Sequence, residues 1–381
     1  MATQMQRLTE LGQSIWLDNI RRSMFASGEL KALIDQGLRG MTSNPTIFEK
    51  AIGHGDDYDA QLRSLIGKVS NPSDLFEALA VQDIRSACDV FRALYDATHG
   101  ADGYVSLEVS PTLARDTQAT IDAAARLWKD VDRPNVMIKI PGTPECVPAI
   151  RASIAAGINV NVTLLFSVDA YEAAAQAYID GVNDRIAKGQ PVDTIASVAS
   201  VFVSRIDTAV DKLLDAKAKA GDSTAAGLIG KIAIANSKII YGRFLKLFDG
   251  PGFAAARSKH GAHVQRPLWA STGTKNPAFS DLMYVEGLVA RDTVNTVPPQ
   301  TLEALLDHGS VQADTILSDL EGARASFDTL AKLNISLRDV TEQLVAEGVK
   351  SFADSFEQML ATIAKKQQAL SAQPAAVAAT R

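Results

Sequence analysis

The sequence has 381 residues, of which 46% are hydrophobic and 22% charged, so we expect a globular chain with a packed core. Its net charge of −6 leaves no excess of Lys and Arg, which argues against nucleic acid as a partner. Two cysteines, Cys88 and Cys146, are too few for a disulfide framework, and no apolar run reaches the length of a membrane span. We therefore expect a cytoplasmic protein that does not bind membranes.

Short apolar runs alternate with longer stretches of helical spacing along the chain. The first long helical stretch covers 72–100, with Ser73 as its expected N-cap. Eight runs have the composition of strands: 13–19, 39–44, 103–110, 136–141, 158–166, 196–207, 266–272 and 292–298. Most are separated by a helical stretch, which is typical of a parallel sheet with crossover helices. Because eight such strands close a (β/α)8 barrel, we predict a TIM barrel with extra helices; an open doubly wound sheet is the alternative.

Helical segments outside this alternation predict additions to the barrel. The segment from about 207 to 262 is longer than an ordinary crossover and predicts a pair of extra helices, and helical patterns continue from 299 to about 370. No linker rich in Pro, Gly or Ser divides the chain, so we expect a single domain over 1–370. Residues 371–381 have the composition of a disordered tail.

The fourth strand run contains a lysine. In 136–141, aliphatic residues alternate with Met137 and Lys139, so these two side chains are expected to face the barrel axis. A buried ammonium group is costly unless it is paired, and burial lowers a lysine pKa. Such a lysine is the nucleophile of Schiff-base chemistry with a ketone or aldehyde. From this strand alone, a structural ion pair is an equally good interpretation.

The same alternation places polar residues of other strands on the axial side. Asp18 lies opposite the aliphatic residues of the first run, Glu108 opposite those of the third, and Asn161 and Thr163 opposite those of the fifth. Chemistry in a barrel collects at the C-terminal ends of the strands. Two carboxylates, an amide and a hydroxyl around Lys139 form an acid/base set around an amine, which favours a catalytic role.

A phosphate site is predicted at the ends of the sixth and seventh runs. Ser200 and Arg205 belong to the sixth run, Ser271 lies at the end of the seventh, and Lys275 follows it. Late barrel strands often bind phosphate through loop amides and a local cation, although a strand-end arginine is also a common surface charge. The five histidines form no i, i+4 pair with a glutamate, so we expect no metal.

Six segments occur in order between about residues 12 and 210: "SIWLDNIRR", "GMTSNPTIFEKAI", "SLEVSP", "VMIKIPGT", "GINVNVTLLFS" and "SVFVSRID". Together they resemble the transaldolase family, a group of class I aldolase-type TIM barrels of the pentose phosphate pathway. Agreement is weaker through "PLWASTGTKNP" and "VNTVPP". The resemblance is greatest for the longer bacterial form, related to the transaldolase part of fusions with phosphoglucose isomerase.

The resemblance implies roles for individual residues and implies no cofactor. The catalytic residues would be Lys139 as the Schiff-base lysine, Asp18 as the general base, and Glu108 with Thr163 as holders of the water that shuttles protons. The substrate-binding residues would be Thr42, Asn44 and Asn161 at the dihydroxyacetone unit, Phe202 in the pocket, and Ser200, Arg205, Ser271 and Lys275 near the phosphate. Shorter members carry an arginine soon after the seventh-strand serine, where this chain has Lys275 in "STGTKNP".

The implied reaction moves a dihydroxyacetone unit from sedoheptulose 7-phosphate to glyceraldehyde 3-phosphate. An activity like that of fructose 6-phosphate aldolase is the alternative enzyme. Related aldolases lack the glutamate at position 108 and tend to have tyrosine at position 202, so Glu108 and Phe202 favour the transferase. A third hypothesis is a non-catalytic barrel that binds ligands, whose simplest signature would be the loss of Lys139 or Glu108. The oligomeric state, monomer or homodimer, stays open.

Overall fold

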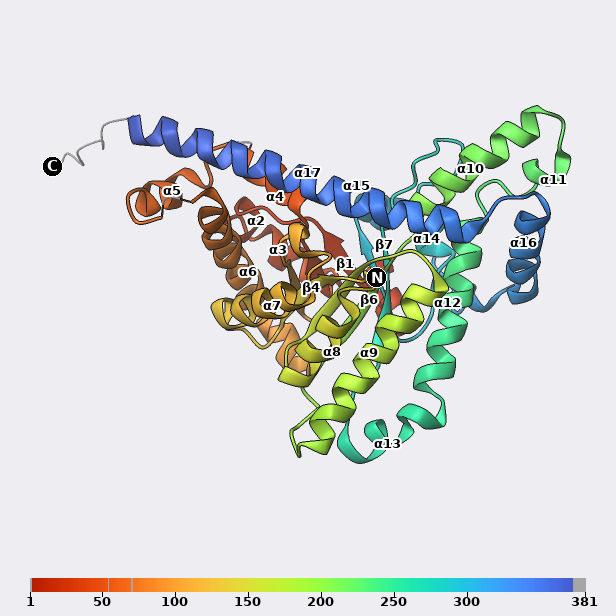
Figure 1. Ribbon diagram of the computed structural model, residues 1–381, viewed down its shortest axis with the longest axis horizontal. Coiled ribbons are helices and arrows are strands. Elements are labelled where there is room, and N and C mark those ends of the chain that lie inside the picture. The colour runs from red at the N-terminus through yellow and green to blue at the C-terminus, as the bar shows by residue number, and fades with distance from the viewer. Residues whose placement is uncertain (1, 54, 70, 373–381) are drawn as a thin grey trace.

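The computed structural model describes residues 2–53, 55–69 and 71–372 (Figure 1). These residues form a closed barrel of eight parallel strands, in which each strand pairs with the next along the chain and β8 pairs with β1. The predicted (β/α)8 barrel is confirmed, and each predicted run contains one strand. The strands are β1 (Gln13–Asp18), β2 (Gly40–Thr42), β3 (Tyr104–Glu108), β4 (Val136–Pro141), β5 (Val160–Leu165), β6 (Ser197–Phe202), β7 (Gln265–Ala270) and β8 (Thr293–Val297).

Helices surround this barrel and follow its strands in the usual alternation. Up to β6 they are α1 (Gln4–Glu10), α2 (Ser23–Ala26), α3 (Glu29–Asp35), α4 (Pro45–Gly53), α5 (Asp59–Leu65), α6 (Pro72–Ala97), a 3-10 turn (Pro111–Leu113), α7 (Thr117–Val131), α8 (Val147–Ala156) and α9 (Val168–Ala187). After β6 they are α10 (Ser204–Lys219), α11 (Ser223–Ala226), α12 (Ile232–Phe248), α13 (Pro251–His260), α14 (Met283–Glu286), α15 (Pro299–His308), a 3-10 turn (Thr315–Leu317), α16 (Leu320–Lys332) and α17 (Leu337–Ala372).

Three details differ from the sequence-based expectations. The connection between β6 and β7 holds the four helices α10 to α13 rather than a pair, and it turns helical at Ser204. The N-cap of α6 is Asn71, whose side chain accepts a hydrogen bond from the Ser73 amide, so Ser73 is not the cap. Ser371 and Ala372 of the predicted tail belong to α17, and 373–381 lie outside the described residues.

The barrel strands are buried on both faces because helices cover the outside and side chains fill the inside. Every residue of β4 is buried, including Lys139. Gly40 shows how tightly the interior is packed: a Cβ there would lie 2.5 Å from a ring carbon of Trp16, its partner on β1. A glycine at this position therefore lets β2 approach β1 and bring Thr42 level with Asp18.

The strand register brings the polar axial residues together at the C-terminal end. Glu108 pairs with Lys139 across β3 and β4, and Lys139 pairs with Asn161 across β4 and β5, so the three form one row. Just beyond Thr163, the β5–β6 register shifts and Leu164 takes a left-handed backbone with φ of 59°. This local bulge was not predicted, and it ends the regular alternation of β5 at Thr163.

Helix α17 lies along one end of the barrel, where Figure 1 shows it as the long blue helix. It packs against α4, α5, α6 and α10, and it also contacts β5. The C-terminal segment of the chain therefore reaches the mouth formed by the strand ends.

Candidate active site

A cavity of about 240 Å³ lies at the C-terminal end of the barrel. The predicted site residues line it except Glu108 and Asn161, which lie beside its floor. The lining residues that the sequence predicted are Asp18, Thr42, Asn44, Lys139, Thr163, Ser200, Phe202, Arg205, Ser271 and Lys275. The structure therefore brings the predicted set together at one place, although it does not test the role of each residue.

Lys139 is the central amine of this cavity and is only 5% exposed. Its Nζ lies 3.0 Å from a carboxylate oxygen of Glu108 and donates a hydrogen bond of 3.2 Å to the Ser43 carbonyl. This geometry fits both a structural ion pair and a Schiff-base nucleophile, because the amine is ion-paired and also faces the cavity. A buried pair of this kind can exchange a proton without charging the surroundings, because the total charge of the pair does not change.

Glu108 is suited to receive and return a proton. Burial raises the pKa of this carboxyl above its usual range, although the neighbouring Lys139 acts in the opposite direction. Glu108 Oε1 and Thr163 Oγ1 are buried atoms without a hydrogen-bond partner among the described residues. Buried oxygens usually find such partners, so both atoms have the capacity to hold a water or a substrate hydroxyl.

Asp18 lines the same cavity at the end of β1. Its carboxylate accepts a hydrogen bond of 2.7 Å from Thr42, whose hydroxyl lies 2.8 Å from that of Thr296. Burial raises the pKa of Asp18, and the charges of Lys139 and Arg205 and the bond from Thr42 lower it. Asp18 therefore combines a fixed orientation with a basicity above that of an ordinary aspartate.

The two predicted asparagines are held differently. Asn161 is fully buried; its side-chain oxygen accepts from Ser200 at 2.7 Å and its amide donates to Ser106 at 3.0 Å. Asn44 uses its side-chain oxygen to accept from the Ile47 amide at the start of α4. The Asn44 side chain therefore lines the cavity in a fixed orientation, whereas Asn161 supports Ser200 from below.

The cationic side of the cavity is formed by Arg205. Its guanidinium lies 5.1 Å from the centre of the Phe202 ring and makes no hydrogen bond or ion pair with another described residue. Ser271 has a left-handed backbone, with φ of 56°, and its hydroxyl lies 2.9 Å from that of Ser204. Lys275 is exposed at the rim. Together they offer charge and donors to an anionic group.

Comparisons with known proteins show the family of this chain. The sequence profile of the family described as "Transaldolase/Fructose-6-phosphate aldolase" matches residues 15–363. The chain belongs to this family. Proteins named "Transaldolase" from Trichodesmium erythraeum and Thermobifida fusca are each 46% identical to it over 367 residues, covering 94% and 96% of this chain and 96% and 99% of those proteins. A "Transaldolase" from Mycobacterium marinum is 43% identical over 364 residues, covering 94% of this chain and 97% of that protein.

This family member also has cavity residues that sequence reasoning missed. Phe352 comes from α17, and its ring centre lies 5.7 Å from Lys139 Nζ. Thr296 and Pro298 come from the end of β8, and Lys50 from α4. Alternation along β8 could have indicated Thr296. No periodicity could have indicated Phe352, because a helical pattern does not tell which barrel end the helix crosses.

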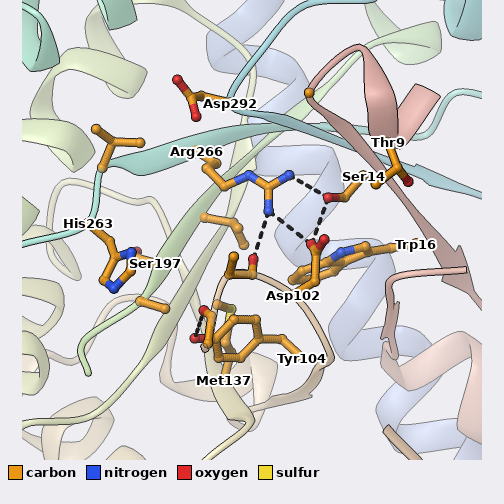
Figure 2. A pocket seen from close by; sticks show the side chains of 16 residues that line it. Thr9, Ser14, Trp16, Asp102, Tyr104, Met137, Ser197, His263, Arg266 and Asp292 are labelled. Atoms are coloured by element: carbon orange, nitrogen blue, oxygen red, sulfur yellow. Dashed lines mark hydrogen bonds and ion pairs between the residues drawn. The ribbon is translucent and has the colours of Figure 1, made fainter. Parts of the chain in front are cut away.

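A second cavity, of about 260 Å³, lies at the opposite, N-terminal end of the barrel of this family member. Figure 2 shows the Arg266 guanidinium pointing toward Ser14 and Asp102, to which it donates at 2.6 and 3.1 Å. The nitrogen that donates to Ser14, Nη2, also donates to the Thr293 carbonyl. Both terminal nitrogens of Arg266 are therefore used within the protein, in an ion-paired cluster that lines the cavity at this end of the barrel.

The described residues provide neither a metal-binding cluster nor a membrane-spanning helix. No group of three or more His, Cys, Asp or Glu side chains among them is arranged to hold a metal ion. Within the same residues, no helix combines the length and apolar character needed to cross a membrane.

Proposed function

We propose that the protein is a transaldolase. It transfers a dihydroxyacetone unit from sedoheptulose 7-phosphate to glyceraldehyde 3-phosphate and produces erythrose 4-phosphate and fructose 6-phosphate, a reaction of the pentose phosphate pathway. The observation that carries this proposal is the buried Lys139–Glu108 pair at the floor of a polar, cation-bearing cavity. Relatives named transaldolase that are 43–46% identical over nearly the whole chain support it.

The first step forms the Schiff base. Lys139 passes a proton to Glu108, and the neutral amine attacks the ketose carbonyl carbon, forming a carbinolamine. Its hydroxyl then takes a proton and leaves as water, with Thr163 and Glu108 orienting the water that relays the proton. The product is a cationic iminium on the Lys139 nitrogen. The lysine itself supplies the electron sink, so the proposed mechanism uses no metal and no cofactor.

The second step breaks and remakes the carbon–carbon bond. Asp18 takes the proton of the hydroxyl on the carbon that leaves as the aldehyde, and the electrons of the breaking carbon–carbon bond move toward the iminium nitrogen, which gives an enamine and a free aldehyde. The enamine then attacks the carbonyl of the acceptor aldehyde, and Asp18 returns the proton to the new hydroxyl. Water hydrolyses the resulting iminium and releases fructose 6-phosphate.

The remaining residues bind the two ends of the sugar. The set proposed for the dihydroxyacetone end supplies amide and hydroxyl groups: Thr42 and Asn44 from the cavity wall, and the buried Asn161 beneath it. The set proposed for the phosphate end supplies a guanidinium, an ammonium and hydroxyls: Ser200, Arg205, Ser271 and Lys275. Phe202 forms an apolar wall between them. Substrates that carry phosphate cannot readily cross a hydrocarbon layer, which supports our proposal of a cytoplasmic location.

The test is a pair of assays on the purified protein. With sedoheptulose 7-phosphate and glyceraldehyde 3-phosphate, we expect erythrose 4-phosphate and fructose 6-phosphate in equal amounts. With fructose 6-phosphate alone, we expect release of free dihydroxyacetone at no more than a few per cent of the transfer rate. Rapid steady release without an acceptor would instead identify a fructose 6-phosphate aldolase-like enzyme. No turnover in either assay would favour a barrel that only binds ligands.

A further inference from the structure

Helix α17 is seated closely on the end of β5, immediately beside the candidate active site. A Cβ placed on Gly348 of α17 would lie 2.9 Å from Leu164 Cδ2, closer than ordinary carbon contacts. Leu164 is the bulged, buried residue that follows Thr163. A side chain at position 348 would displace the Leu164 side chain, so glycine lets α17 lie close to the end of β5 without moving this residue.

One helical turn after Gly348, α17 directs Phe352 into the cavity. The side chain lines the same cavity as Lys139, and the residue is 4% exposed. Its ring centre lies 5.7 Å from Lys139 Nζ and 5.9 Å from the central guanidinium carbon of Arg205. Both distances are within the range of about 6 Å in which a cation interacts favourably with an aromatic face.

The buried aromatic face of Phe352 beside the lysine nitrogen affects two intermediates of the proposed reaction, the iminium and the enamine. The iminium carries its positive charge at this nitrogen, so an aromatic ring nearby stabilises it. The enamine must survive until an acceptor arrives. If water enters first, the enamine carbon takes a proton, water adds to the resulting iminium carbon, and the C–N bond breaks to release dihydroxyacetone and the neutral amine.

We infer that Phe352 is the roof of the site, and that it stabilises the iminium and excludes water from the enamine, so that transfer outpaces hydrolysis. This inference rests on the proposed Schiff-base function. It assigns to α17 a specificity role: the helix sets the ratio of group transfer to aldol cleavage. Phe356, one turn further along, is the natural comparison because it packs edge-on against Phe76, with ring centres 5.6 Å apart, and does not line the cavity.

The test compares Phe352→Leu with Phe356→Leu in the full chain. Each variant removes one aromatic ring from α17, and thermal unfolding checks that both remain folded. We measure transfer to an acceptor aldehyde, dihydroxyacetone release without an acceptor, and the fraction of chain trapped by borohydride with saturating fructose 6-phosphate. Phe352→Leu should raise the ratio of release to transfer about tenfold and lower the trapped fraction, consistent with loss of a desolvated cation–π contact. Phe356→Leu should leave both within about twofold of wild type.

The outcomes separate this inference from the proposed function. If wild type is trapped at Lys139 and Phe352→Leu has the same release-to-transfer ratio as Phe356→Leu, the roof inference is wrong while the proposed function stands. If wild type forms no adduct, the proposed function fails and this inference fails with it. Phe352→Met fills the space without an aromatic face, and it should behave like Phe352→Leu if that variant is too unstable to assay.

Discussion

Removal of the Glu108 carboxylate should destabilise the folded protein, because it leaves the charge of Lys139 buried without its partner. The two side chains are only 6% and 4% exposed, and their charged atoms are 3.0 Å apart. At an effective dielectric constant of about 20, this separation corresponds to an attraction of about 5.5 kcal/mol. Desolvation of two buried ions costs several kcal/mol each, so the intact pair adds little net stability, whereas a single remaining charge is unfavourable. Glu108→Gln should therefore lower the free energy of unfolding by about 3 kcal/mol at neutral pH.

A double-mutant cycle tests this reasoning. Glu108→Gln, Lys139→Met and the double variant are unfolded in urea and followed by circular dichroism. Because the double variant leaves no buried charge at this position, it should be more stable than Glu108→Gln by at least about 1.5 kcal/mol. If the two single effects instead add within about 0.5 kcal/mol, the groups are not energetically coupled and the buried-pair account is wrong.

Three further predictions concern single side chains. Arg205→Ala removes a charge-assisted contact, so it should raise KM for phosphorylated sugars about tenfold or more and change KM for unphosphorylated ones less than twofold; equal changes would count against a phosphate role. Burial raises the pKa of Asp18, and the base must be ionised, so kcat/KM should fall with decreasing pH at a midpoint above the ordinary aspartate value of about 3.9. A midpoint at or below that value would argue that Asp18 is not the base. Burial raises the pKa of Asp211 to about 6, and its carboxylate accepts from the Gly230 amide. The folded state therefore binds more protons than the unfolded state between about pH 4 and 6, and stability should decrease as pH rises through this window. In urea titrations Asp211→Asn should flatten this dependence, and an unchanged slope would contradict the assignment.

The barrel could be predicted from the sequence because its signals are local. Each strand is a short apolar run between helical stretches, and eight such runs correspond to a closed parallel barrel. The connection after β6 was harder to predict, because helix-forming residues indicate that helices are present but not the three breaks, at Gly221, Gly230 and Gly250, that divide the segment into α10 to α13. Boundaries of this kind depend on tertiary contacts that local patterns do not contain.

The site residues that lie on strands could be predicted from the alternation of side chains along each strand, which we call strand parity. Alternation along a strand fixes which side chains face the axis, and for this reason Asp18, Glu108, Lys139 and Thr163 meet in one region. Parity does not fix which oxygen pairs with which nitrogen. It also says nothing of Phe352, whose position depends on the path of α17 across the barrel mouth and on its close seat against β5.

Trapping of the Schiff base tests the central claim most directly. Incubation with fructose 6-phosphate and borohydride, followed by peptide mass mapping, should reveal a three-carbon adduct on Lys139 after loss of the aldehyde product. The adduct should disappear in Lys139→Ala and persist in Lys50→Ala, which changes another lysine that lines the cavity. Absence of any adduct, or an adduct on Lys50 or Lys275 in the wild-type protein, would contradict the assignment of Lys139 as the nucleophile.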